Sequence, residues 1–445
     1  MKKREHNGKR WKTFQNWFVN QGFHCFFLTV ILVLAGGNQV QQMQATTISY
    51  YQESELEQLK KAHQNRNQSY IPEEAQPYTK KKQEEGVSKQ QLELYAKAAA
   101  LIDADSGRVL YGKDENTRYP MASTTKIMTC IYTIENSNLD DVVTVSAKAA
   151  SQPKTRLGIR EGEQYRMKDL LYALMLESCN DCAVAIAEHV SKSVDNFCRE
   201  MTVKAQELGC TDTQFETPNG LDSQGHYTTA AELAKIGAYA IKNETFLTIT
   251  NQASYSFQEL TKGQKHTVYN KNAFLTMYEG AMGIKTGYTS KASYCFAGAV
   301  SRDCRTFVSV VLASGWYPKK TYKWQDTKKL MDYGVNQYQR VTLLRPSLCL
   351  EPIKVNKGIK KAVAITEQGS VRTLLKKGDV VDYRIDYSQT SLTAPVVKNQ
   401  VVGYLSIYIN GSEYKKIPLL TAETCKQWNY SWCLKQTLKR FFSVL

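Results

Sequence analysis

The spacing of apolar residues divides the chain into segments of different secondary structure. An apolar run at residues 98–103, a turn at 105–107 and a second run at 108–111 predict a strand pair. Apolar positions spaced three and four apart then predict helices, and short apolar runs after them predict a strand meander. The helical segments are 127–134, 167–190 with an interruption at 178–181, 232–241 and 323–339, and the later strands are 283–287, 294–300 and 306–312. This order predicts an α/β (α+β) domain over residues 93–340.

Different patterns flank this domain. Residues 46–92 are rich in Gln, Glu and Lys, and they predict a polar linker with one short helix. Short alternating strands after the domain, among them 381–387 and 401–409 with a turn at Asn410-Gly411, predict a small all-β domain over residues 343–420.

Both ends of the chain carry patterns that point to a membrane. Basic residues precede an apolar run from Phe23 to Ala35, and small residues follow it, which is typical of a signal peptide or an uncleaved anchor within residues 1–45. Residues 421–445 predict an amphipathic helix that lies on a membrane surface, with docking on the protein itself as the alternative. Its apolar stripe is Leu434, Leu438, Phe441, Phe442 and Leu445, opposed by Lys435, Gln436, Lys439 and Arg440. We therefore expect an exported protein at the outer face of the cytoplasmic membrane or in the cell wall.

The net charge of +16 indicates an anionic partner such as a membrane surface or a cell-wall polymer. Nucleic acid is not expected, because the chain has no zinc-finger spacing, no RNP-like run and no basic helix with base-reading spacing. The eleven cysteines show no disulfide framework, and we expect most of them to be small buried apolar residues. Cys179 and Cys182 form a C-x-x-C, which is a weak metal or redox signal without a second such pair.

Candidate chemistry starts with the tetrapeptide S-x-x-K. A serine hydroxyl needs a neighbouring base to become a nucleophile, and a lysine amine serves where burial and positive charge lower its pKa. Spacing of three residues on a helix places both side chains on one face. The chain contains three such pairs, which are Ser123/Lys126, Ser151/Lys154 and Ser412/Lys415. Only Ser123 opens a strong apolar helix, so we select Ser123 as the nucleophile and Lys126 as its base.

A second motif, S-x-N, interrupts the helical region 167–190. Ser178 and Asn180 place polar groups among apolar ones, and buried polar groups need hydrogen-bond partners. The motif is either a plain turn between two helices or a proton relay by Ser178 with an amide of Asn180 that orients Lys126 and a substrate.

The third motif is Lys285-Thr286-Gly287, followed by Tyr288, on a predicted strand. A lysine and a threonine offer a cation and a hydroxyl to a carboxylate, and glycine lets a ligand backbone approach closely. The alternative is that Lys285 is an ordinary strand lysine that faces solvent.

In this order, S-x-x-K, S-x-N and K-T-G are the motif set of penicillin-recognising serine enzymes. The chain resembles the D-Ala-D-Ala carboxypeptidases among the low-molecular-mass penicillin-binding proteins, serine peptidase family S11, over about residues 95–420. Beyond the motifs, the likeness includes residues 98–111, 120–129, 218–222, 226–230 and 285–289. It implies a penicillin-binding/β-lactamase-like transpeptidase fold followed by a small β domain and a terminal amphipathic helix.

The resemblance also implies acyl transfer without a metal or a cofactor. Ser123 would attack the carbonyl between the two terminal D-alanines of a peptidoglycan stem peptide, and water would release the shortened peptide. The amides of Ser123 and Tyr288 would form the oxyanion hole, and Ser178 would pass a proton to the leaving D-alanine. Lys285 and Thr286 would hold the terminal carboxylate, and β-lactams would act as covalent inhibitors at Ser123.

Two positions depart from the usual family pattern. Cys179 stands where the family commonly has a small residue, often glycine. Lys271 stands in a stretch that often carries an arginine, so it brings charge without the bidentate hydrogen bonding of arginine.

The alternative functions are a β-lactamase-like hydrolase, a DD-endopeptidase or transpeptidase, and a non-enzymatic wall-binding protein. We can place no glutamate for the fast deacylation of class A β-lactamases, and neither H-E-x-x-H nor G-x-S-x-G is present.

Overall fold

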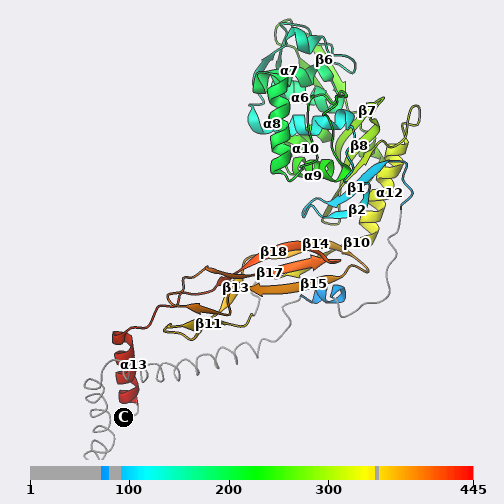
Figure 1. Ribbon diagram of the computed structural model, residues 1–445. Helices are drawn as coiled ribbons and strands as arrows, with labels where there is room; N and C mark the ends of the chain where they lie inside the picture. Colours follow the sequence, from blue (N-terminus) through cyan, green and yellow to red (C-terminus); the bar gives the residue numbers. More distant parts are fainter. Residues whose placement is uncertain (1–71, 80–91, 346–349, 444–445) are drawn as a thin grey trace, which may run out of the picture. The chain divides into compact units, whose positions relative to one another are not determined.

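The computed structural model describes residues 72–79, 92–345 and 350–443 (Figure 1). These residues group into two compact units. We call the unit formed by 92–341 and 372–379 the α/β body, and the unit formed by 72–79, 342–345, 350–371 and 380–443 the β body. The expected signal peptide or anchor at 1–45 lies outside the described residues. Among the described helices, none has the length and apolar character that a membrane span requires.

A five-stranded antiparallel sheet forms the centre of the α/β body, in the order β2-β1-β9-β8-β7. Its strands are β1 (Ala98–Asp103), β2 (Val109–Lys113), β7 (Ala281–Thr289), β8 (Ser293–Arg302) and β9 (Arg305–Leu312). All six residues of β1 are buried, in agreement with its unbroken apolar run. The expected strand pair and the expected meander thus join into one sheet, which leaves β7 at an edge.

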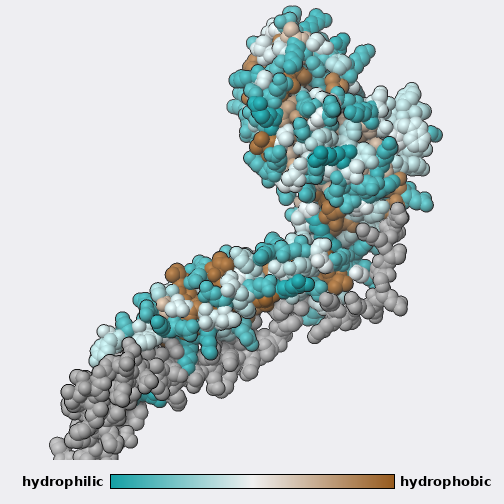
Figure 2. Space-filling view, in the orientation of Figure 1, coloured by the Kyte–Doolittle hydropathy of each residue, from teal (hydrophilic) through white to brown (hydrophobic). Residues whose placement is uncertain are grey.

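Helices cover both faces of this sheet. A side chain added at Gly237 of α9 (Ala230–Ala240) would meet Val308, whereas one added at Gly334 of α12 (Tyr322–Gln337) would meet Phe307. Successive strand residues point to opposite faces, so α9 and α12 lie on opposite sides of the sheet (Figure 1). The visible surface of this body is largely hydrophilic (Figure 2), as expected when the apolar residues fill the interior.

The remaining helices pack beyond α9. Cys130, Leu171 and Ile186 are fully buried in the same apolar core as Ala234 of α9. The short elements are η3 (Ala122–Thr125), α5 (Ala147–Ala150), α11 (Phe274–Met277) and two strand pairs, β3 (Val142–Thr144) with β4 (Gln164–Arg166) and β5 (Ser254–Gln258) with β6 (Lys265–Tyr269). The longer helices are α4 (Lys126–Asn136), α6 (Met167–Leu176), α7 (Asn180–Ser191), α8 (Val194–Glu207) and α10 (Glu244–Asn251). The helix predicted over 167–190 is therefore two helices, with the break where the polar residues interrupt the pattern.

The β body is all-β apart from its first and last helices, η2 (Glu73–Tyr78) and α13 (Tyr430–Ser443), which confirms the expected fold class. One sheet has the order β13-β18-β17-β15, and a second has the order β12-β11-β16. The strands β10 and β14 form a separate pair, and most of its residues belong to the α/β body. Their bounds are β10 (Tyr338–Leu344), β11 (Ile353–Asn356), β12 (Ala362–Val363), β13 (Ile365–Glu367), β14 (Val371–Lys376), β15 (Val381–Tyr387), β16 (Ser391–Thr393), β17 (Val401–Ile409) and β18 (Ser412–Thr421).

Two segments add detail to the domain boundaries expected from sequence, and the first contains the short helix expected in the linker. Part of the expected linker is folded: Ala75 of η2 is fully buried, and the Glu74 carboxylate accepts hydrogen bonds from the Thr342 amide and the Arg345 guanidinium, at 3.1 and 2.7 Å. Residues 372–379, expected in the β domain, group with the α/β body, where Asp379 forms a 2.9 Å ion pair with Arg108. Both segments are short and polar, so composition alone does not show which unit they pack against.

Candidate active site

The three motifs meet where η3, the α6–α7 turn and the edge strand β7 come together. Ser123 lies in η3, and Lys126 begins α4. The β7 backbone runs directly beside η3, since a side-chain carbon added at Gly287 would lie 3.0 Å from the Ser123 amide nitrogen and 3.1 Å from the Met121 carbonyl oxygen. Only glycine allows this approach, which places the Gly287-Tyr288 backbone next to the amide and hydroxyl of Ser123.

Lys126 is fully buried, and three oxygens surround its amine. The Nζ atom lies 2.9 Å from Ser123 Oγ, 2.9 Å from Asn180 Oδ1 and 2.5 Å from the Asn219 carbonyl oxygen. Burial lowers the pKa of Lys126 well below its ordinary value, and the positive charge of Lys285 lowers it further. A neutral amine donates two hydrogen bonds, to the Asn180 and Asn219 oxygens, and turns its lone pair to the Ser123 hydroxyl. This is the arrangement that a general base requires.

Lys285 is also buried, with only 2% of its surface exposed, which rules out the solvent-facing strand lysine. Its Nζ donates to the Thr286 carbonyl oxygen at 3.1 Å. Burial lowers the pKa of Lys285 to about 7, and the positive charge of Lys271 acts in the same direction. Lys271 itself is largely exposed, 3.4 Å from the Glu177 carboxylate, so it acts on the site through its charge.

The S-x-N motif is both a turn and part of the site. Ser178 is half-buried in the turn between α6 and α7, with a left-handed φ of 68°. Asn180 starts α7, accepts from Lys126, and donates from its side chain to the Pro153 carbonyl oxygen at 3.1 Å. Its backbone amide donates to the Thr155 carbonyl oxygen at 2.8 Å. Asn180 therefore joins the 153–155 loop to the base.

Sequence reasoning gave no role to the turn at Asn219-Gly220, although its N-G dipeptide is a turn signal. The Asn219 carbonyl oxygen accepts from Lys126, and the Asn219 side chain donates to Gln152 Oε1 at 3.0 Å. Gly220 has a φ of 84°, and a side-chain carbon there would lie 2.0 Å from the Ala122 carbonyl oxygen. This contact sets the position of the backbone immediately before Ser123.

His226 supports the backbone at Ala122 through the hydroxyl of Thr125. Its Nδ1 accepts from the Glu216 amide at 3.0 Å, so its proton is on Nε2, which lies 2.8 Å from Thr125 Oγ1. The Thr125 hydroxyl donates onward to the Ala122 carbonyl oxygen at 2.8 Å. Burial lowers the pKa of His226 to about 4, so the ring is neutral at physiological pH and serves as a fixed hydrogen-bonding group.

The C-x-x-C lies beside an acidic residue, but the surroundings of the three side chains do not favour a metal. Ligand atoms of Cys179, Asp181 and Cys182 lie within 4.8 Å of one another, and all three residues are buried. However, the Asp181 carboxylate accepts hydrogen bonds from the amides of Leu157 at 3.0 Å and Gly158 at 2.8 Å, and burial raises the pKa of Cys182 well above its ordinary value. A metal needs free carboxylate oxygens and thiolates, so the cluster fits a structural clamp better. Of the nine described cysteines, only Cys304 is exposed.

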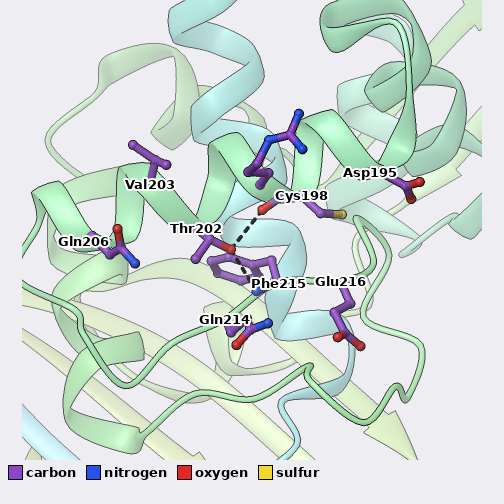
Figure 3. A pocket seen from close by; sticks show the side chains of 9 residues that line it. Asp195, Cys198, Thr202, Val203, Gln206, Gln214, Phe215 and Glu216 are labelled. Carbon is purple, nitrogen blue, oxygen red and sulfur yellow. Dashed lines mark hydrogen bonds between the residues drawn. The ribbon is translucent and has the colours of Figure 1, made fainter.

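A hollow of about 520 Å³ lies on the surface of α8, beside residues 214–216 (Figure 3). The Thr202 hydroxyl donates to the Cys198 carbonyl oxygen and accepts from the Phe215 amide, and these bonds hold the segment against the helix. No residue of the three motifs lines this hollow, so it is separate from the candidate site at Ser123.

Comparisons with known proteins identify the family of this chain. The D-alanyl-D-alanine carboxypeptidase family, peptidase S11, matches residues 84–315, and the C-terminal domain of penicillin-binding protein 5 matches residues 338–427. The D-alanyl-D-alanine carboxypeptidase DacF of Bacillus subtilis is 31% identical, over 80% of this chain and 92% of its own length. DacC of Escherichia coli is 29% identical, over 75% and 84%.

Solved structures show the same relationship. Penicillin-binding protein 5 of Haemophilus influenzae superposes with a TM-score of 0.65 at 26% identity, over 77% of this chain and all of its own. The Streptomyces K15 DD-transpeptidase is 31% identical with a TM-score of 0.53, over 56% of this chain and 99% of its own. With its motifs assembled around Ser123 and both domains matched, this chain belongs to the D-alanyl-D-alanine carboxypeptidase family, peptidase S11.

Proposed function

We propose that this serine-type carboxypeptidase removes the terminal D-alanine from peptidoglycan stem peptides through an acyl-enzyme on Ser123. The contact that carries the proposal is the 2.9 Å approach of the buried, low-pKa amine of Lys126 to Ser123 Oγ. Lys126 takes the hydroxyl proton as Ser123 Oγ attacks the carbonyl between the two D-alanines. The hydroxyl of Ser178 carries a proton to the leaving amine, and water then cleaves the ester.

Substrate binding follows from the edge strand. Lys285 and Thr286 hold the terminal carboxylate through a charge-assisted hydrogen bond. The amides of Ser123 and Tyr288 stabilise the tetrahedral oxyanion, because the Gly287 backbone lies close to the Ser123 amide. Asn180 orients Lys126 and donates to the peptide that precedes the scissile bond. β-Lactams, which mimic D-Ala-D-Ala, acylate the same serine.

The test uses the purified full-length chain in mild detergent with diacetyl-Lys-D-Ala-D-Ala as substrate. Release of D-alanine by the parent protein and none by Ser123→Ala is the expected result, together with penicillin labelling that the variant lacks. A folded parent protein that neither releases D-alanine nor labels with penicillin contradicts the proposal and favours a non-enzymatic wall-binding role.

A transpeptidase remains the second candidate, because the Streptomyces K15 DD-transpeptidase is 31% identical over almost its whole length. The two activities share the acyl-enzyme and differ in whether water or an amine accepts the acyl group. Adding glycine to the same assay separates them. A carboxypeptidase yields the shortened peptide throughout, whereas a transpeptidase yields a glycine adduct as the main product.

The proposal places the enzyme at the outer face of the cytoplasmic membrane, held there by α13. Tyr430, Leu434, Leu438 and Phe442 are exposed on this helix, at 47% to 67% of their surface, and exposed lysines lie between them. Exposed apolar residues beside cations suit an interfacial helix on anionic lipid. Sedimentation with phosphatidylglycerol vesicles checks this: the parent chain should pellet, and Leu438→Glu should stay in solution. Equal pelleting of both contradicts the role of α13.

A further inference from the structure

Tyrosine and tryptophan side chains gather around the end of β7, and the proposed chemistry uses none of these rings. We call the group formed by Tyr95, Tyr288, Tyr294, Trp316 and Tyr317, together with Tyr322, the aromatic surface. Its most exposed members are Tyr317 at 75%, Trp316 at 61%, Tyr95 at 47% and Tyr288 at 43%. Large exposed aromatic side chains gathered at one place mark a binding surface rather than a random feature of the exterior.

Ring contacts connect the aromatic surface to the K-T-G strand. The rings of Tyr288 and Tyr294 lie 4.5 Å apart, across the β7–β8 pair. Tyr317 directly follows Trp316 in the chain. Trp316 packs edge-on against Tyr322 at 6.0 Å, and Tyr322 stacks on Tyr95 at 3.7 Å.

A buried carboxylate holds the segments that carry these rings. Asp326 of α12 is fully buried, and it accepts hydrogen bonds from the amides of Tyr95 at 3.0 Å and Ala96 at 2.7 Å. The Ser314 hydroxyl donates to the same carboxylate at 2.7 Å, and the Ser314 amide donates to the Tyr294 carbonyl oxygen at 2.7 Å. The backbone at Tyr95, Tyr294 and Ser314 is therefore held in place before any ligand arrives, which reduces the entropy lost on binding.

The direction of the substrate leads to this surface. In the proposed function, the terminal carboxylate lies at Lys285 and Thr286, and the reacting carbonyl lies between Ser123 and Tyr288. The rest of the stem peptide must then continue past Tyr288 and beyond the end of β7. Three further residues in extended form span about 10 Å, which brings the sugar that carries the stem beyond the Tyr288 ring.

The charge of the segments around the aromatic surface also favours peptidoglycan as the ligand. Residues 281–302 and 304–325 contain no Asp or Glu, whereas Lys291, Lys319 and Lys320 are exposed in them. Stem peptides carry free carboxylates, and amino sugars present apolar C–H faces and acetyl groups. Cations with aromatic rings complement both features of peptidoglycan.

We propose that the aromatic surface is a subsite for the amino-sugar glycan backbone that carries the stem peptide. It rests on the proposed function, and it makes polymeric, glycan-linked stems the preferred substrate over free peptides. The sugar faces stack on Trp316 and Tyr317, while Tyr288 borders the passage from the scissile bond to the glycan.

The test compares two substrates of the full-length enzyme: diacetyl-Lys-D-Ala-D-Ala, and soluble uncrosslinked glycan strands with pentapeptide stems. In the double variant W316A/Y317A, we expect kcat/KM for the tripeptide to stay within about twofold, and kcat/KM for glycan strands to fall about ten- to thirtyfold through KM, as expected when two ring contacts are lost. The ring-preserving variant W316F/Y317F should recover most of this loss. Tyr387→Ala, an exposed tyrosine of the β body, is the matched control and should change neither substrate.

A separate binding measurement keeps this inference apart from the proposed function. Glycan strands stripped of their stems should change the tryptophan fluorescence of Ser123→Ala, and should not change that of W316A/Y317A in the same background. If the parent enzyme does not hydrolyse the tripeptide, the proposed function fails while this measurement still reports on the glycan. The subsite is overturned if W316A/Y317A loses kcat/KM equally on both substrates or on neither. It is also overturned if the double variant changes oligomeric state, which would favour a protein interface.

Discussion

The buried position of Lys285 predicts an unusual alkaline limit for the enzyme. Its pKa is lowered to about 7, so it loses its charge as the pH rises through 7, whereas an exposed lysine would stay charged to about pH 10. About one tenth of the free enzyme retains the charge at pH 8, and about one hundredth at pH 9. Because kcat/KM reports the free enzyme, it should fall with a slope of one from about pH 7.

The structure also limits the size of this fall. A hydrogen bond to a charged group contributes about 1.5 to 3 kcal/mol, so the loss should level off after about ten- to hundredfold. Substrate carboxylate bound to Lys285 favours its charged form, so the alkaline limb of kcat should lie at higher pH than that of kcat/KM. At acid pH, activity should fall as Lys126 becomes protonated, at a pH well below the ordinary lysine range.

The assay is D-alanine release from the tripeptide between pH 5 and 10, with penicillin acylation rates as a second readout. Lys285→Arg keeps its charge throughout this range, so it should lower kcat/KM at pH 7 but lack the alkaline limb. Lys323 is the rival group, since burial lowers its pKa to about 8, and Lys323→Gln should retain the limb. An unchanged limb in Lys285→Arg, or its loss in Lys323→Gln, would refute the reasoning.

Three further predictions test the frame around the site. Gly220→Ala should lower Tm by at least about 5 °C more than Gly107→Ala, as measured by differential scanning calorimetry. Both glycines have a left-handed φ, but only a side-chain carbon at Gly220 would meet a carbonyl oxygen, that of Ala122 at 2.0 Å. Since the folded pKa of His226 is below its unfolded value of 6.5, its contribution to stability is complete above pH 6.5 and is lost as the pH falls towards 4, by roughly 2 to 3 kcal/mol at pH 4.5. Urea unfolding at pH 7.5 and 4.5 should show this loss for the parent and a smaller one for His226→Gln. Lys271→Gln should move the alkaline limb of Lys285 to higher pH by removing a like charge, and a shift to lower pH would contradict this.

Local apolar patterns in the sequence predicted much of the fold, because each motif lies on a helix or strand with strong apolar periodicity. The buried run of β1, the interrupted helix at Ser178 and the edge strand with Lys285 could all be read from apolar spacing. The order of strands could not, since the placement of β9 beside β1 depends on contacts between residues about 200 positions apart. The short helix expected in the linker is present as η2, but its burial could not be predicted, because one buried alanine in a polar stretch gives no periodic signal.

The sequence predicted the candidate site less completely than it predicted the fold. Side-chain motifs identified Ser123, Lys126 and Lys285, whose chemistry is visible in the residue type. The Asn219 contribution is a backbone carbonyl oxygen, which every residue possesses, so the sequence signalled only the turn and not its role. The neutral ring of His226 depends on the acceptor role of Nδ1 towards a distant amide, and this contact exists only after folding.

The two buried lysines together account for the choice of a free carboxy terminus. Burial opposes charge on both Lys126 and Lys285, and the positive charge of Lys285 lowers the pKa of Lys126 further. In the proposed mechanism, the site works only when Lys285 is charged and Lys126 is neutral, and a substrate carboxylate at Lys285 favours this distribution. A peptide that continues beyond the second D-alanine supplies no such charge and leaves a buried cation without a counter-ion, which is costly in a dry site. In the proposed mechanism, the same geometry that activates Ser123 therefore favours carboxypeptidase over endopeptidase chemistry.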